Sequence, residues 1–278
     1  MTRCIHCTSL PGVIVLVLVA SLTGCAAPSA KLSGVSFKDI NLQSMTILFD
    51  IELTNPNSAP LPLADLDYEL SSRGNSFFTG QAPLQGDVPA RSAKTISLPA
   101  RITYSQILTA LSDVKPGSVL PYKADLGLSI KVPVIGKLRL PVHKEGNLPV
   151  PTAPKVELEQ VKWDKLTFDS AGGVFRIRMT NRNQFPMEMA RMAYGLTLGK
   201  MEIAKSSLAR PVSLDPNGGE GIVEIPVSFS PRKFGLAALG MLTGDSSYEL
   251  GGEISVKTPY GPMSLPFDRK GDIRLRRR

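Results

Sequence analysis

Residues 48–70 read LFDIELTNPNSAPLPLADLDYEL, and residues 174–196 repeat them as VFRIRMTNRNQFPMEMARMAYGL without a gap, at a constant offset of 126 residues. Nine positions are identical: Phe49/Phe175, Ile51/Ile177, Thr54/Thr180, Asn55/Asn181, Asn57/Asn183, Pro60/Pro186, Ala64/Ala190, Tyr68/Tyr194 and Leu70/Leu196. Solenoid repeats have periods of ~20–50 residues. A unit of this length therefore indicates two copies of one domain.

The repeat continues outside this stretch. Residues 122–133 face 248–259 at the same offset of 126, and Leu140-Pro141 faces Leu265-Pro266 at an offset of 125. Between these blocks, Leu98-Pro99 faces Ile225-Pro226 at an offset of 127. Offsets that drift by one residue are typical of loops that gained or lost a residue while the strands kept their alignment.

Apolar and polar residues alternate within each copy. Phe49, Ile51 and Leu53 alternate with acidic residues, and Phe175, Ile177 and Met179 alternate with basic ones. A period of two predicts half-buried strands. Further strands are expected at 67–71, 93–100, 123–132 and 138–142, and at 194–198, 222–229, 248–257 and 263–267. Many short strands separated by Gly and Pro predict an all-β chain folded as antiparallel β-sandwiches.

One short helix is expected in each copy. Ser230-Pro231 offers an N-cap followed by proline at the first helical position, and Phe234 and Met241 lie on the expected apolar face. The counterpart is 105–112, with Ile107, Leu108 and Leu111 as its apolar face. Both faces are interpreted as core packing.

The first residues predict a targeting segment. An apolar stretch at 13–20 is too short to cross a bilayer, which needs ~20 residues, and Leu22-Thr23-Gly24-Cys25 follows it. That arrangement resembles the bacterial lipoprotein signal, which implies cleavage before Cys25 and a lipidated Cys25. Cys4 and Cys7 would leave with the signal, so the mature chain would hold no free thiol and no disulfide. The residue after the cysteine is not Asp, and an outer-membrane anchor facing the periplasm is therefore expected.

These observations predict the following organisation: a signal peptide at 1–24, a tether at 25–33, a first domain at 34–146, a Pro-rich linker at 147–154, a second domain at 155–272 and a basic tail at 273–278. Three prolines in six residues predict an extended, stiff linker that holds the domains apart or end to end.

Asn55-Pro56-Asn57 follows a strand and precedes a segment with proline and then a tyrosine strand. This arrangement resembles the water stress and hypersensitive response (WHy) domain, also called late embryogenesis abundant (LEA) type 2. The second copy keeps Asn181 and Asn183 and loses the proline. The resemblance covers both copies, and it implies a fibronectin- or immunoglobulin-like β-sandwich with a short helix, an association with desiccation and stress tolerance, and no enzymatic activity.

The asparagines themselves predict a turn. Asn side chains bond nearby backbone groups and tolerate unusual turn geometry, and Pro56 restricts Asn55 to an extended shape. A structural role is favoured over ligand binding.

Residues suited to catalysis are scarce. His143 is the only histidine after the signal, and its counterpart is Asp268, which indicates a tolerant surface position. We expect no catalytic site, no metal site and no cofactor. The mature chain would carry 31 basic and 24 acidic residues, a net charge of +7. The basic cluster Arg274, Arg276, Arg277 and Arg278 suits either an anionic envelope surface or a frayed solubilising tail. Nucleic acid is not an expected partner.

The sequence therefore predicts a lipid-anchored, non-enzymatic envelope protein that protects other proteins or membranes during water loss. Two alternatives remain at this point. The first is a module that binds or carries an apolar ligand, lined by Phe77, Phe78, Met187, Met189 and Met192. The second is a scaffold that recruits an envelope complex through the Arg-rich tail.

Overall fold

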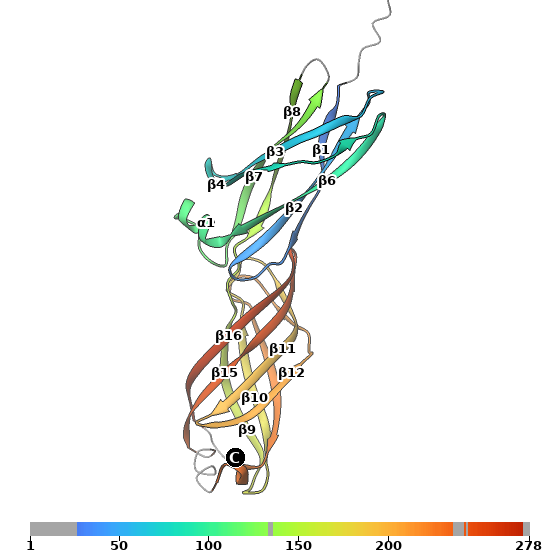
Figure 1. Cartoon of the computed structure of the whole chain (residues 1–278). Coiled ribbons are helices and arrows are strands. Elements are labelled where there is room, and N and C mark those ends of the chain that lie inside the picture. Colours follow the sequence, from blue (N-terminus) through green and yellow to red (C-terminus); the bar gives the residue numbers. More distant parts are fainter. Residues whose placement is uncertain (1–26, 133–135, 236–241, 243, 275–278) are drawn as a thin grey trace, which may run out of the picture.

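The computed structural model describes residues 27–132, 136–235, 242 and 244–274. Two β-sandwiches lie end to end and give the molecule an elongated shape (Figure 1). Domain 1 contains β1 (Ser29–Lys38), β2 (Ser44–Asn55), β3 (Leu61–Ser72), β4 (Asn75–Pro83), β5 (Asp87–Val88), β6 (Ser92–Thr103), α1 (Tyr104–Ala110), β7 (Val119–Val132) and β8 (Gly136–Pro149). Domain 2 contains β9 (Lys155–Leu166), β10 (Ala171–Thr180), β11 (Met187–Leu198), β12 (Met201–Leu208), β13 (Val212–Leu214), β14 (Glu220–Phe229), the 3-10 helix η1 (Pro231–Phe234), β15 (Asp245–Thr258) and β16 (Gly261–Arg274).

The two domains have the same strand order. One sheet of domain 1 runs β1-β2-β6, and the other runs β4-β3-β7-β8, with β5 paired to β3. Domain 2 repeats this as β9-β10-β14 and β12-β11-β15-β16, with β13 paired to β11. All of these pairs are antiparallel. The predicted all-β fold with two tandem antiparallel sandwiches is confirmed.

The alternation seen in the sequence points the same residues inward in both domains. Phe49, Ile51 and Leu53 in β2 are fully buried, as are Phe175 and Ile177 in β10. Burying side chains of this size contributes about 1.5–3 kcal/mol each, as an upper estimate. These two central strands therefore anchor the cores of their sandwiches.

The outward charges of the two copies have opposite signs because both partners changed. Lys31 of β1 lies opposite Glu52 of β2, and their side chains are 2.9 Å apart. In domain 2, the acid Glu157 of β9 lies opposite the base Arg178 of β10. Complementary charge across the strands is thus kept while its sign is reversed.

Six strands were not predicted, namely β1, β4, β9, β12 and the two very short strands β5 and β13. In β1 the register shifts between Leu32 and Gly34, and β9 has two such irregularities against β10. A bulge shifts the alternation by one residue, so the period of two disappears from the sequence. β4 is a short edge strand with mostly exposed, polar residues.

The helix prediction is confirmed in domain 1 and differs in domain 2. Ile107 and Leu111 are buried on the core side of α1, and the Thr103 N–H donates to Gln106 Oε1 at 3.1 Å. In domain 2 the described helix is only η1, and Phe234 is 39% exposed rather than packed in the core. Residues 236–241 and 243 lie outside the described residues.

The expected connecting segments carry more regular structure than predicted. β1 starts at Ser29, inside the segment expected as a tether. β8 runs through Pro149, inside the expected linker, because Val119 of β7 pairs with Pro149. β16 runs to Arg274, inside the expected basic tail, and its last residue pairs with Asp245. Pairing with the next or the preceding strand of the chain explains all three differences.

Candidate functional site: the asparagine turns and the joint between domains

Asn55 and Asn181 hold the same turn in the two domains, and both are fully buried. In each copy Nδ2 donates to the carbonyl oxygen four residues ahead, at 2.9 Å and 2.8 Å. It also donates to the carbonyl of Val88 in β5 or Leu214 in β13, at 3.1 Å and 3.2 Å. Each Oδ1 accepts the backbone N–H two residues ahead, at 3.0 Å and 2.9 Å. The side chain thus ties the end of the central strand to the opposite sheet.

The second asparagine differs between the copies. Asn57 is half-buried, whereas Asn183 is fully buried. Asn183 Oδ1 accepts the N–H of Thr152 at 2.8 Å, and its Nδ2 donates to the Thr152 carbonyl at 3.0 Å. Thr152 belongs to the segment that connects the domains. Asn183 therefore fixes the connecting segment to domain 2.

The loop between α1 and β7 of domain 1 touches the same turn. Gly117 N–H donates to the Val150 carbonyl at 2.6 Å, and the Gly117 carbonyl accepts the N–H of Gln184 at 2.7 Å. The side chain of Gln184 accepts the Val119 N–H at 2.9 Å. Gly117 has φ +96°, and a Cβ there would lie 2.5 Å from the carbonyl oxygen of Arg182. Only glycine fits this position.

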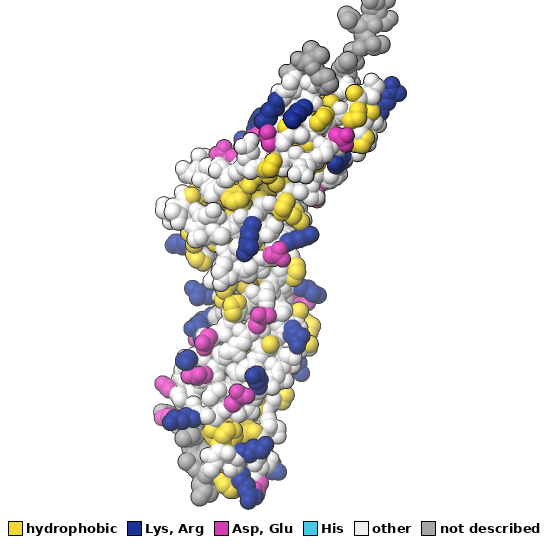
Figure 2. Space-filling model, in the orientation of Figure 1, with side chains coloured by type: hydrophobic (Ala, Val, Ile, Leu, Met, Phe, Trp, Pro, Cys, Tyr) yellow, Lys and Arg dark blue, Asp and Glu magenta, His cyan; other side chains and the backbone are white. Residues whose placement is uncertain are grey.

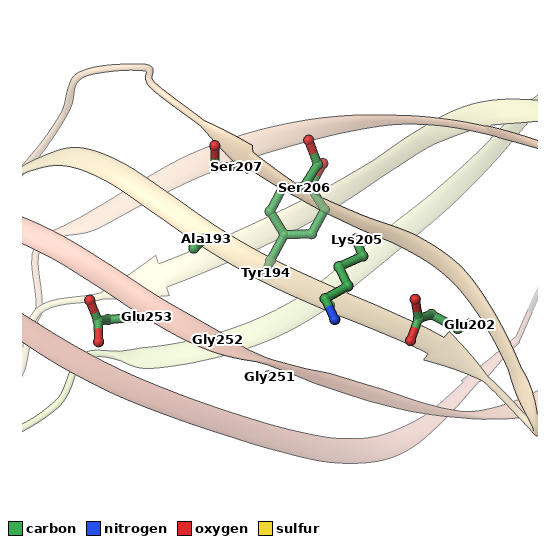
Figure 3. Close-up of a pocket in the computed structure, with 10 residues that line it drawn as sticks. Ala193, Tyr194, Glu202, Lys205, Ser206, Ser207, Gly251, Gly252 and Glu253 are labelled. Carbon is green, nitrogen blue, oxygen red and sulfur yellow. The ribbon is translucent and has the colours of Figure 1, made fainter.

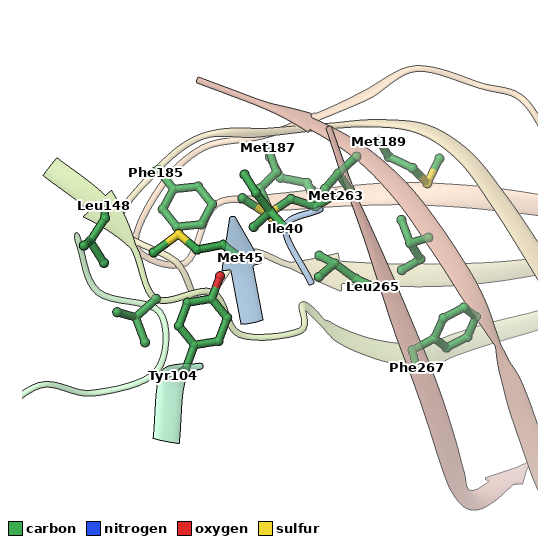
Figure 4. Packing of buried hydrophobic residues seen from close by; sticks show 14 of the residues in the cluster. Ile40, Met45, Tyr104, Leu148, Phe185, Met187, Met189, Met263, Leu265 and Phe267 are labelled. Carbon is green, nitrogen blue, oxygen red and sulfur yellow. The ribbon is translucent and has the colours of Figure 1, made fainter. Parts of the chain in front are cut away.

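Aromatic and sulfur-containing side chains fill the space behind these hydrogen bonds. Tyr260, in the β15–β16 hairpin, lies edge-on to Phe37 of domain 1, with ring centroids 5.8 Å apart, and to Phe185, at 5.4 Å. Figure 4 shows residues of both domains in one packed region: Ile40, Met45, Tyr104 and Leu148 from domain 1, with Phe185, Met187 and Met263 from domain 2. The two cores form one continuous cluster. The connecting segment is therefore a packed joint. Of the two arrangements expected for the linker, apart or end to end, the structure has the domains end to end.

The joint explains what sequence reasoning missed. Gln184, Phe185 and Tyr260 were not singled out, although the alignment carried a signal. Copy one has Ser58 and Ala59 where copy two has Gln184 and Phe185, in the middle of the best-matched block. A large residue that replaces a small one at a turn indicates a new contact. Tyr104 also lies at the joint, where burial raises the pKa of its hydroxyl.

The polar groups of the first asparagine are committed to the turn itself. Both hydrogens of Asn181 Nδ2 have carbonyl acceptors, and its Oδ1 accepts from the N–H and the side chain of Asn183. These are the contacts of a structural turn, and they leave the Asn181 side chain no spare donor for a ligand.

A shallow groove crosses the outer face of β12, β11 and β15 in domain 2 (Figure 3). Its floor is nearly bare backbone because Gly195 lies opposite Gly251. Glu202, Lys205 and Glu253 stand along its rim. Burial raises the pKa of Tyr194, and Ser206 beside it partly offsets that rise. The groove holds no pair of facing acid and base groups at catalytic spacing in the described contacts.

His143 forms a surface pair in domain 1. Its Nδ1 lies 2.5 Å from Asp125 Oδ1, and its side chain is 62% exposed. Burial pushes the pKa of Asp125 upward, but hydrogen bonds from His143 and Lys123 outweigh it and hold that pKa below its usual value. Domain 2 has Gly251 and Asp268 at the paired positions. Both residues of the pair differ between the domains, as expected for exposed positions that the fold does not constrain.

The end of domain 2 farthest from domain 1 is closed by its own aromatic residues. Trp163 lies edge-on to Phe175 and Phe229, and Phe229 contacts Phe234. Trp163 is the repeat counterpart of Phe37, which contacts Tyr260 at the joint. At this end Phe229 and Phe234 lie where a neighbouring domain would otherwise pack.

The residues considered for an apolar ligand are engaged in packing. Met187, Met189 and Met192 are core residues, and Phe77 is 7% exposed. Phe78 stacks on Tyr68 with ring centroids 5.5 Å apart. These side chains fill the sandwiches themselves.

Several predicted site residues lie outside the described residues, namely Cys25, Arg276, Arg277 and Arg278. Lipidation of Cys25 and a role for the tail remain predictions. Within the described ranges, no helix has the length and apolar character needed to cross a membrane. No three His, Cys, Asp or Glu side chains gather there in a way that could hold a metal ion.

A family model described as late embryogenesis abundant protein, LEA_2, matches residues 50–146 and 176–271, which cover most of both repeats. The chain belongs to the LEA_2 family. It is 30% identical over 131 residues to the desiccation protectant protein Lea14 homolog of Glycine max, covering 47% of this chain and 86% of that protein. It is 28% identical over 131 residues to the probable desiccation-related protein LEA14 of Arabidopsis thaliana, covering 47% and 87%.

The solution structure of AT1g01470 from Arabidopsis thaliana is 26% identical to the chain, over 49% of this chain and 90% of that one, with a TM-score of 0.39. The alignments with these LEA_2 relatives are each about one repeat long. The two matched segments of the family model begin inside β2 and β10, so β1, β9 and the connecting segment at 147–154 lie outside them.

Proposed function

We propose that this LEA_2 protein is a lipid-anchored, non-enzymatic envelope protein that protects nearby proteins or membranes during water loss. The observation that carries the proposal is family membership, together with relatives named as a desiccation protectant and as desiccation-related. The N-terminal segment ending in Leu22-Thr23-Gly24-Cys25 supports an anchor in the outer membrane, facing the periplasm.

The surface favours shielding over the capture of unfolded chains. A protein that holds unfolded clients needs a contiguous exposed apolar patch. Among the described residues the exposed large hydrophobic side chain is Phe234, at the far end of domain 2. Charges of both signs are scattered over the face shown in Figure 2. A folded protein with such a hydrated surface keeps other proteins or membranes apart during drying, because it occupies the space between them and retains bound water.

The sheet edges are consistent with this role. β6 and β14 are edge strands, and each carries a proline in its interior, Pro99 and Pro226. Proline cannot donate a ladder hydrogen bond and blocks pairing with another chain. A shield that works at high concentration must avoid aggregating with itself.

Two experiments test the proposal. In vitro, a drying-sensitive enzyme is dried and rehydrated with this protein or with an equal mass of albumin, and recovered activity and light scattering are measured. We expect higher recovery with this protein. Equal recovery would remove support for shielding.

In cells, the gene is deleted and restored as wild type or as Cys25→Ala, and survival after drying is scored. Mass spectrometry of the restored wild-type protein reports whether Cys25 carries lipid. We expect lipid on Cys25 and rescue by the wild type only. An unmodified Cys25, or full rescue by the Cys25→Ala variant, would contradict the anchored form of the proposal.

A further inference from the structure

The start of β1 places one end of domain 1 next to the predicted anchor. Only Ala26, Ala27 and Pro28 separate Cys25 from Ser29, the first residue of β1. Each extended residue spans at most ~3.6 Å, so the reach from Cys25 to Ser29 is about 14 Å. This step depends on the anchor in the proposed function. The end of domain 1 that lies away from domain 2 is then held at the lipid headgroups (Figure 1).

The corresponding end of domain 2 forms the joint, so it shows how this end of the sandwich contacts another domain. There, Gln184 accepts the N–H of Val119, and Phe185 packs on Tyr260 at the joint. Domain 1 has Ser58 and Ala59 at the positions of Gln184 and Phe185. It therefore lacks these side chains, which dock domain 2 onto its neighbour.

Domain 1 instead carries cations at this end. We define the basic tip as Arg91, Lys94, Lys131 and Lys137. Copy two has Asn217 at the position of Arg91, since both have left-handed φ and donate their N–H to the carbonyl of the second asparagine at 2.9 Å. Strand register places Gly221 at the position of Lys94, Pro262 at that of Lys137 and Lys257 at that of Lys131. Three of the four cations are thus particular to domain 1.

Two cations of the basic tip are engaged within domain 1, one by a carboxylate and one by a backbone carbonyl. Lys137 Nζ lies 2.7 Å from Asp65, and Lys94 Nζ donates to the Asp87 carbonyl at 2.9 Å. Arg91 and Lys131 are exposed, and among the described contacts neither has an ion-pair partner. These two side chains remain available to an external anion.

We propose that the basic tip rests on anionic phospholipid headgroups and orients the anchored molecule upright on the membrane. The phosphate groups of anionic lipids supply the opposite charge. Domain 2 and the end of β16 at Arg274, after which the Arg-rich tail begins, then lie away from the anchoring membrane, because the joint holds the domains end to end. The tail would consequently meet partners other than that membrane.

The test uses residues 25–278 with Cys25→Ser, so that binding does not depend on lipidation. Every residue of the shared core lies between Ile40 and Phe267, so this piece contains the whole core. Flotation with phosphatidylglycerol–phosphatidylcholine vesicles and with phosphatidylcholine vesicles gives the partition coefficients. We expect binding to the anionic vesicles only. The double variant Arg91→Gln/Lys131→Gln should lower it by about fivefold for each cation, or roughly 25-fold.

A matched control removes the same charge from the far end of domain 2, as Lys165→Gln/Lys233→Gln. A second control changes Arg276, Arg277 and Arg278 to Gln. The proposal requires the tip variant to lose far more binding than either control. Equal loss in the tip variant and the domain 2 control would overturn it, and so would loss confined to the tail variant.

The outcome is separable from that of the proposed function. A tip that fails to bind vesicles leaves a lipidated Cys25 and drying survival unaffected. Conversely, an unmodified Cys25 in cells leaves the vesicle measurement as it stands.

Discussion

The Asn-Pro-Asn turn of domain 1 and the Asn-Arg-Asn turn of domain 2 are alike in their first asparagine and unlike in their last. Asn55 and Asn181 make matching hydrogen bonds to the carbonyl four residues ahead and to β5 or β13. Asn57 donates only its backbone N–H within the turn. Asn183 donates the same N–H, and its side chain also makes two hydrogen bonds to the backbone of Thr152 at the joint. A residue repeated in both copies can thus have a shared role or a role set by its neighbour.

The largest effect is expected from removing the shared role. Asn181→Ala leaves two buried carbonyls and one N–H without their side-chain partner, and each loss costs about 1–3 kcal/mol. We expect the free energy of unfolding to fall by about 3–5 kcal/mol in Asn181→Ala and by a similar amount in Asn55→Ala. Urea unfolding of each variant measures this loss, provided that the m value is the same as in the wild type. A cost below about 1 kcal/mol in either variant would break the equivalence of the two asparagines.

The second effect is loss of coupling between the domains. Tyr260→Ala removes ring contacts with Phe37 and Phe185 and should cost about 2–3 kcal/mol. We expect calorimetry to show one transition in the wild type and two in the variant, because the cores no longer unfold together. Phe78→Ala is the control, since its ring contacts Tyr68 away from the joint. It should destabilise domain 1 without splitting the transition.

The third effect separates the two second asparagines. Asn183→Ala removes both hydrogen bonds to Thr152 and should cost about 1–2 kcal/mol. Asn57→Ala removes a half-buried side chain with no described hydrogen bond, so the change should stay within about 0.5 kcal/mol. Chemical unfolding of the two variants side by side is the measurement. Equal costs would contradict a joint-specific role for Asn183.

The smallest effect is expected in how the stability of the fold depends on pH, through a carboxylate on the outer face of a sheet. A hydrogen bond from Arg139 lowers the pKa of Asp67, and domain 2 has Ala193 at the position of Asp67. A carboxylate with a lowered pKa stabilises the fold at neutral pH, and this contribution disappears as pH falls through that pKa. The Asp67→Asn variant should therefore lose stability less steeply below about pH 4. Urea titrations at a series of pH values measure the slope, and an unchanged slope would contradict the prediction.

Most of the fold could be predicted from the sequence because both copies report the same packing. Phe49 and Phe175 alternate with charges along regular strands, and so β2 and β10 were evident. The strands β1 and β9 were not, since bulges disturb their period. The joint was also hidden. Gly117 meets Gln184 only after the chain has folded, and a contact between distant segments leaves no local pattern.

The candidate site was predictable in its residues and not in its contacts. The sequence indicated that Asn55 and Asn181 end a strand in a turn. It could not distinguish Asn57 from Asn183, because the partner of Asn183 is the backbone of Thr152, whose side chain is not involved. Backbone partners carry no residue-specific signal.

The aromatic closure at Trp163 bears on how such a protein can grow by gene duplication. The position that receives Tyr260 in domain 1 is filled in domain 2 by Phe229 and Phe234, which belong to the same domain. If a third copy followed the second, the site where its aromatic side chain would pack is already filled. A third copy docked in the same way as the second would first require small residues at both phenylalanines.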